Sequence, residues 1–169
     1  MQKLLPHWDK ITETLNQTAS WVGILPLRLI LAWEFFEAGL MKFNGENWFS
    51  HVQENFPFPF NIVPTEISWF MATWFEILGG IGLALGLFTR FWSISLIILT
   101  IVAIAGVHWP SEWNSFGDLL KGYAISDDGY GNYKLPLIYL TMFIPLLMQG
   151  SGKLSLDHVM RRVLSAKMQ

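Results

Sequence analysis

The chain has 169 residues, of which 52% are hydrophobic and 14% are charged, and its formal net charge is −2. Because an average soluble protein carries about 25% charged residues, this composition disfavours a water-soluble domain and indicates a single membrane domain over residues 1–169. The net charge gives no case for nucleic-acid binding. The sequence contains no cysteine, which excludes disulfides, thiol catalysis and iron–sulfur ligation by this chain.

The first 20 residues predict a helix that lies on the membrane surface rather than a signal peptide. Leu4, Trp8, Ile11 and Leu15 are spaced along one helical face, and polar residues occupy the positions between them. An amphipathic helix of this kind lies in the interface plane with its apolar face toward the hydrocarbon. Residues 155–167 at the carboxyl end repeat the pattern.

Four apolar stretches are predicted to cross the bilayer, at residues 21–41, 67–88, 91–108 and 135–149. About 20 residues at a rise of about 1.5 Å cover the hydrocarbon core, and backbone amides in lipid must be paired within their own segment. The predicted fold is therefore an all-α, integral membrane four-helix bundle with amphipathic interfacial helices at both ends. A soluble four-helix protein is the alternative, but residues 91–107 lack the charged outward face that it requires.

The distribution of Lys and Arg predicts the orientation of these spans. Seven of these residues lie on one side and three on the other, and the richer side is normally cytoplasmic. We expect a multi-pass protein of the bacterial inner membrane with both termini in the cytoplasm. The connections 43–66 and 109–134, rich in aromatic residues, then form a semi-ordered lid on the outer interface. The seven are Lys3, Lys10, Arg90, Lys153, Arg161, Arg162 and Lys167, and the three are Lys42, Lys121 and Lys134.

Four charged residues, Arg28, Glu34, Glu37 and Glu76, fall inside predicted spans. A charge at mid-bilayer costs about 2.5–3.5 kcal/mol even on the lenient insertion scale, so such residues mark a site by default. We expect Arg28 and Glu76 to contact each other or to share a polar cluster within the bundle. We also expect a polar column open toward the outside, formed by these four residues and His108. The functional site is expected in the outer half, lined by Glu34, Glu37, Glu76 and His108.

The predicted site continues beyond this column. Lys42 lies at its rim, and residues 48–60, with Trp48 and His51, are expected to cover it. Alternatives remain open, because an Arg28–Glu76 pair can serve only to fix helix register and Glu37 can pair locally with Lys42.

Metal binding is weakly indicated. His51, His108 and a carboxylate would suit a metal that prefers imidazole, but the histidines lack a dedicated ligand spacing. Both can equally be interfacial residues beside Trp48 and Trp109. No metal site and no catalytic residue is predicted.

Three stretches resemble a known family over nearly the whole chain. They are LRLILAWEFFEAGLMKF at residues 27–43, EILGGIGLALGLFTR at 76–90 and SGKLSLDH at 151–158. In this order they resemble the DoxX-like small membrane proteins, whose recurrent Arg, Gly-x-x-Lys and acidic positions fall on Arg28, Gly39 to Lys42 and Glu76. Within this family, the Glu-bearing sequence WEFFEAG and the long aromatic outer connection resemble the branch that accompanies the production of modified copper-binding peptides.

The resemblance leaves several functions open. It implies an accessory membrane protein that supports maturation or export of a small secreted peptide, with other membrane or secreted proteins as partners. The alternative is a quinone-binding subunit of a respiratory or stress-related oxidoreductase complex. A transporter ranks last, because four spans leave little room without homo-oligomerisation. Neither a peptide nor copper is indicated by composition or spacing.

Overall fold

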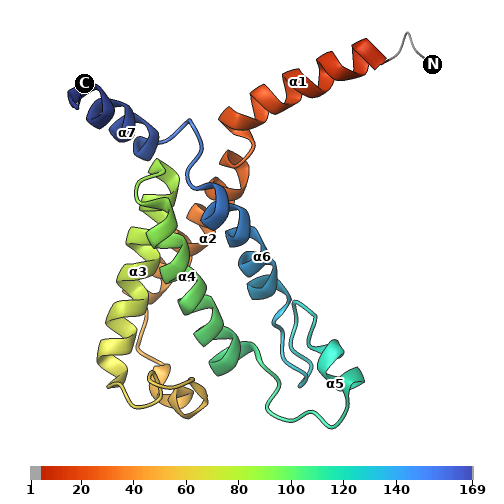
Figure 1. Cartoon of the computed structure of the whole chain (residues 1–169). Coiled ribbons are helices and arrows are strands. Elements are labelled where there is room, and N and C mark those ends of the chain that lie inside the picture. The colour runs from red at the N-terminus through yellow and green to blue at the C-terminus, as the bar shows by residue number, and fades with distance from the viewer. Residues whose placement is uncertain (1–4, 169) are drawn as a thin grey trace.

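The computed structural model describes residues 5–168, with side chains from Trp8 onward, and this part of the chain is helical without strands (Figure 1). Leu4 and Lys3, used in the sequence predictions, lie outside the described residues. The elements are α1 (Leu5–Val22), α2 (Leu25–Asn44), the 3₁₀ turns η1 (Phe49–His51) and η2 (Gln53–Asn55), α3 (Thr65–Leu85), α4 (Thr89–Ala103), the π-helix η3 (Ile104–His108), α5 (Phe116–Lys121), α6 (Lys134–Gln149) and α7 (Leu156–Lys167).

Among the described residues, three helical stretches are long and apolar enough to cross a membrane: Trp8–Asn44, which comprises most of α1 and all of α2, Thr65–Leu85 and Thr89–His108. They contain the first three predicted spans except at the α3–α4 turn, where Gly86 takes the left-handed conformation with φ 64° and ends α3 before residue 88. α6 has 16 residues, fewer than the roughly 20 that a straight span needs. The all-helical membrane character therefore agrees with the sequence, whereas a bundle of four membrane-crossing helices stays a prediction.

α2, α3, α4 and α6 share one apolar core. Leu31, Leu83, Leu96 and Phe143 come one from each of these helices, and all four side chains are fully buried. Within a membrane such side chains stabilise the fold through van der Waals packing against one another, because the surrounding lipid is as apolar as they are. These contacts hold α6 against the other three helices despite its short length.

Glycines bring α2 and α3 into close contact. A Cβ built on Gly80 would lie 2.8 Å from the carbonyl oxygen of Ala32, and one on Gly39 would lie 2.8 Å from the backbone nitrogen of Ile77. Since backbone atoms cannot move aside easily, a side chain at either position would push the helices apart. Small residues at the contact are the usual means of close helix approach in membranes.

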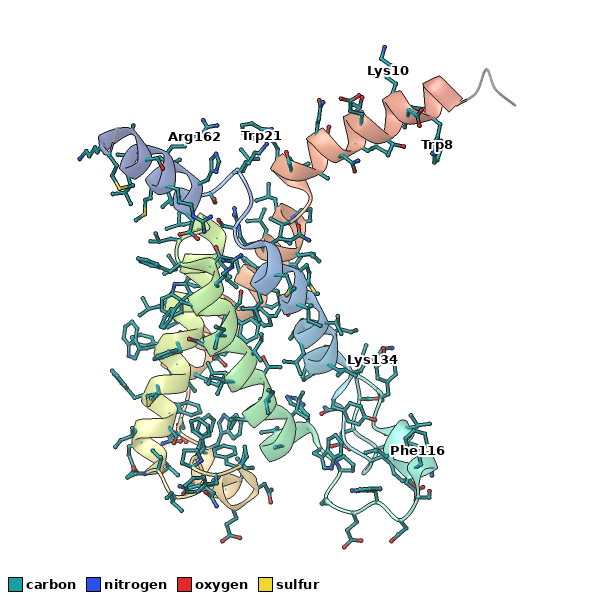
Figure 2. All side chains as sticks on the ribbon, in the orientation of Figure 1. Trp8, Lys10, Trp21, Phe116, Lys134 and Arg162 are labelled. Atoms are coloured by element: carbon teal, nitrogen blue, oxygen red, sulfur yellow. The ribbon has the colours of Figure 1, made fainter. Side chains whose placement is uncertain are left out.

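The two ends of the bundle carry different parts of the chain. α1 and α7 lie at one end, while η1, η2 and α5 lie at the other (Figure 1). We call these the terminal end and the connection end. α1 and α7 extend away from the bundle, and the side chains of Trp8 and Lys10 point to opposite sides of α1 (Figure 2). This arrangement fits amphipathic helices, with α1 separated from α2 by a break at Gly23.

Candidate functional site

A cavity of about 530 Å³ lies between α3 and α4, beneath η1 and η2. Its size is in the range of small-molecule sites. α3 and α4 meet at their shared turn and diverge toward the connection end (Figure 1), and the cavity occupies the wider part. Most lining side chains are apolar. The polar ones are Lys42, Ser68, Glu76, Ser95 and His108.

Large aromatic rings fill the narrow part of the space between α3 and α4. The ring of Trp92 packs so closely against Gly82 that a Cβ there would lie 2.3 Å from it. Phe75 meets the same ring nearly edge to face, with centroids 6.0 Å apart. The helices therefore remain in contact through side chains near the turn, and free volume is left only toward the connection end.

The aromatic cover, residues 48–60, lies over the wide end of the cavity. Trp48, Phe49, Phe56 and Phe60 all line it. The ring of Phe56 is buried against Gly106 of the π-helix, where a Cβ would lie 2.3 Å from the ring. Phe49 packs edge to face on Phe56, with centroids 5.2 Å apart. The cover is thus held by aromatic contacts rather than by regular secondary structure.

An ion pair forms part of the cavity wall. Lys42 Nζ donates hydrogen bonds to both carboxylate oxygens of Glu76, at 3.0 and 2.8 Å. Their side chains are only 18% and 10% exposed. Gly39 explains the geometry, because a Cβ at Gly39 would lie only 3.0 Å from the Cβ of Glu76. Lys42 lies about one turn further along the same face of α2 and so reaches the Glu76 carboxylate. Each buried charge is compensated by the other.

His108 lies at the end of the π-helix and contributes to the opposite part of the wall. Its Nδ1 is 2.7 Å from the amide oxygen Oδ1 of Asn132, in the second long connection. An amide oxygen only accepts, so Nδ1 is the donor and Nε2 of the neutral ring is an acceptor. A π-helix at a helix end often accompanies a functional site.

The predicted Arg28–Glu76 contact is wrong. Arg28 instead donates to the carbonyl oxygens of Ser151 and Leu154, at 2.5 and 2.8 Å, in the connection before α7. Its guanidinium lies beside Gly86, ten residues and about 15 Å along α3 from Glu76. Arg28 therefore belongs to the terminal end.

The predicted polar column also divides into separate groups. Glu34 accepts a hydrogen bond of 2.5 Å from the hydroxyl of Tyr139 on α6, and Glu37 is exposed on α2. Both positions are rotated by about 140–160° from Gly39, which faces α3. Neither residue lines the cavity, so Glu76 and His108 are the members of the column that share it. Of the rim and cover residues, Lys42 and Trp48 line the cavity, and His51 is exposed outside it.

Two polar partners were missed by the sequence predictions. Tyr139 binds Glu34 and Asn132 binds His108. A Tyr within an apolar span carries a hydroxyl that needs a partner, which was the available signal for Tyr139. Asn132 gave no such signal, because it lies in an irregular connection.

Among the described residues, no group of three or more His, Asp or Glu side chains is arranged to hold a metal ion. The cavity wall instead offers a donor at Lys42 and an acceptor at His108, separated by apolar surface. Such a wall suits a largely apolar ligand that makes a few hydrogen bonds.

Comparison with known proteins identifies the family. Residues 23–109, which include α2, α3, α4 and the π-helix, match the DoxX family. The chain is 45% identical over 148 residues to a protein of Haemophilus influenzae described as an uncharacterized protein, with 88% of this chain and 89% of the relative covered. No solved structure matches the chain. The matched region contains every residue that lines the cavity, and the chain belongs to the DoxX family.

Proposed function

We propose that this DoxX-family protein is an accessory protein of the bacterial inner membrane that supports maturation or export of a small secreted, metal-binding peptide. The observation that carries the proposal is the aromatic surface at the connection end. Besides the cover, it includes exposed residues of the second connection: Trp113, Phe116, Tyr123 and Ile125. Exposed apolar residues that gather at one end of a protein are typical of interaction surfaces.

The proposed topology places this surface outside the cell. Seven Lys and Arg residues on the terminal side against three on the connection side favour cytoplasmic termini. Four helices that alternate in direction, with α6 as the fourth crossing, agree with that count. A secreted peptide would then meet the connection end directly, beside the headgroups of the bilayer.

Partners at this surface would be the peptide, other membrane or secreted proteins of the same system, or a second copy of this chain. We assign any copper to the peptide rather than to this protein. The support is chemical, because the cavity is lined by apolar side chains and by a Lys–Glu pair whose carboxylate is already engaged.

Site-specific cross-linking in cells tests the peptide role. A photoreactive amino acid would replace Phe58, which is 79% exposed in the cover, and Phe88, 58% exposed at the terminal end, would be the matched control. We expect a small-peptide adduct from position 58 and none from position 88. Identical adducts from both positions, or adducts with lipid alone, would contradict the proposal.

A second candidate is a quinone-binding subunit of an oxidoreductase complex. It is favoured by the cavity, where Lys42 and His108 are polar groups in a largely apolar wall. Extraction of the protein purified in mild detergent, followed by ultraviolet absorbance of the extract, tests it. A stoichiometric quinone in the unaltered protein and a loss in Lys42→Met would support this candidate, and a quinone-free extract would count against it.

A further inference from the structure

We propose that the cavity opens sideways into the bilayer and takes an uncharged, membrane-dissolved molecule that carries a hydrogen-bond acceptor. This inference goes beyond the peptide role, because it concerns the interior of the cavity rather than the exposed aromatic surface. It deepens the second candidate at the same cavity by giving the ligand's route of entry and a second hydrogen-bond donor, and it does not require the ligand to be a quinone. Three features of the described residues lead to it: the rim, the charge of the wall, and one buried hydroxyl group.

The rim of the cavity lies on the membrane-facing side of two helices. Met71 of α3 and Ile98 of α4 both line the cavity, yet their side chains are 43% and 45% exposed. Both helices are apolar and long enough to cross the membrane. Met71 lies about 9 Å from the start of α3, and Ile98 lies about 15 Å before His108. The opening between them therefore faces hydrocarbon, and a ligand dissolved in the bilayer meets it without passing through water.

The extent of the cavity sets the shape of the ligand. Lining residues run along one side from Ser95 to His108, a distance of roughly 20 Å for 13 residues. Between these ends the wall is made of Ile98, Leu99 and Val102, with Phe75 opposite. An elongated apolar molecule, such as a ring with a chain, fits this space better than a compact polar one.

The charge of the wall selects an uncharged ligand. Lys42 and Glu76 neutralise each other through two hydrogen bonds. A charged ligand would have to separate them and leave one charge buried without a partner, which is strongly destabilising. The ammonium group has three N–H donors, and two of them bind Glu76. The third is left to donate to a neutral acceptor.

Ser68 supplies a second donor. Its side chain is 9% exposed, and its Oγ has no hydrogen-bond partner among the described residues. Three other buried polar atoms share that property, but Ser68 is the one of the four that lines the cavity. Because a buried hydroxyl without a partner is costly, a ligand carbonyl or ether oxygen would remove that cost. The three other atoms are Arg28 Nε, Thr89 Oγ1 and His158 Nε2.

Photolabelling from the bilayer tests the entry route. The whole protein in lipid nanodiscs would be illuminated with benzophenone, an uncharged aryl ketone that dissolves in lipid, and the labelled residues would be identified by mass spectrometry. We expect labels on Phe75 and Leu99 inside the cavity as well as on lipid-facing Ile81. Labels restricted to Ile81 would overturn the lateral opening.

Rim variants provide the matched control. Met71→Trp and Ile98→Trp would fill the opening, whereas Ile94→Trp adds the same bulk at a position that is 49% exposed but lies outside the cavity. We expect each rim variant to reduce labelling inside the cavity and to leave Ile81 unaffected, and Ile94→Trp to change neither. Equal labelling in all variants would show that ligands do not enter between α3 and α4.

The acceptor requirement is tested with a second probe. Adamantane diazirine is equally lipid-soluble but has no carbonyl group. We expect Ser68→Ala to lower benzophenone labelling inside the cavity about fivefold, the worth of one hydrogen bond, and to leave adamantane diazirine labelling unchanged. An equal response of both probes would overturn the role of Ser68. Neither outcome depends on cross-linking at Phe58, so this inference and the peptide proposal fail separately.

Discussion

The two ends of the bundle use their polar side chains in different ways. At the terminal end these side chains bind main-chain groups of distant segments: Arg28 binds the carbonyl oxygens of Ser151 and Leu154, and Asp157 accepts from the backbone amides of Phe88 and Thr89. At the connection end, Lys42 and Glu76 bind each other beside a cavity. The first arrangement joins four parts of the chain into a fixed unit, and the second leaves space for a ligand.

This contrast gives the third stretch of the family resemblance a structural role. Residues 151–158 provide the carbonyl groups for Arg28, the N-cap Ser155 of α7 and the carboxylate of Asp157. Through Asp157 they bind the backbone amides of the α3–α4 turn, and so they hold the point from which α3 and α4 diverge. The terminal end thus positions the helices that form the cavity about 10–30 Å away.

The largest expected effect is that of Arg28→Leu at the terminal end. The substitution removes two charge-assisted hydrogen bonds and leaves two carbonyl groups without their donor, so we expect a loss of about 4 kcal/mol in unfolding free energy. Thermal or denaturant unfolding in detergent measures it. Arg90→Leu is the matched control, because Arg90 also donates to two carbonyl oxygens but is exposed, and it should cost far less. Equal losses would show that burial does not distinguish the two sites.

The ion pair at the connection end should respond differently. Glu76→Leu strands the buried ammonium of Lys42 and should cost about 3 kcal/mol, whereas the double variant Lys42→Met/Glu76→Leu should recover much of the loss, because no charge remains unpaired. A double-mutant cycle from unfolding free energies measures the coupling. Strictly additive losses would mean that the two side chains do not interact.

Substitutions at two glycines test the α2–α3 contact and the packing of the aromatic cover. Gly80→Ala pushes a Cβ against backbone atoms of α2, so we expect a loss of about 2 kcal/mol. In Gly106→Ala the atoms nearest to the new Cβ belong to the ring of Phe56, a side chain rather than backbone. Its cost should be smaller, but it should loosen the aromatic cover and speed amide hydrogen exchange at residues 48–60. Faster exchange there in Gly80→Ala instead would contradict this assignment.

Asp157→Ala should destabilise the α3–α4 turn by about 1 kcal/mol. In the unaltered protein the carboxylate of Asp157 accepts hydrogen bonds from the backbone amides of Phe88 and Thr89, at the start of α4. Hydrogen exchange at residues 88–92 measures the local effect. Asp157→Asn keeps one acceptor oxygen and should restore part of the protection. An unchanged exchange rate in Asp157→Ala would show that the turn does not depend on this contact.

Much of the helical framework could be predicted from sequence because hydropathy reports directly on which segments avoid water. The partner of Glu76 could not, because it depends on how α2 is rotated against α3. Contacts at Gly39 and Gly80 set that rotation, and they place Lys42 on Glu76 while Glu34 and Glu37 face elsewhere. Span prediction registers the apolar character of a helix but not the direction of each side chain. The cavity itself arises from the divergence of α3 and α4, which no local pattern encodes.

The smallest expected effect lies in α5, outside the membrane-spanning segments, where an exposed carboxylate contrasts with the buried pair of the cavity. Hydrogen bonds from Lys121 and from the hydroxyl of Ser115 lower the pKa of Asp118. A carboxyl group whose pKa is lower in the folded state stabilises it above the unfolded pKa, near about 4, and this contribution disappears as the pH falls through the folded pKa. We therefore expect the protection factors of the α5 amides to be the same throughout the range from about pH 5 to about pH 7, which lies about one unit or more above the unfolded pKa. They should fall slightly on further acidification. Because exposed pairs contribute little, the change should be small, and Asp118→Asn should abolish its pH dependence. If the variant keeps the same pH profile as the unaltered protein, another group controls the stability of α5.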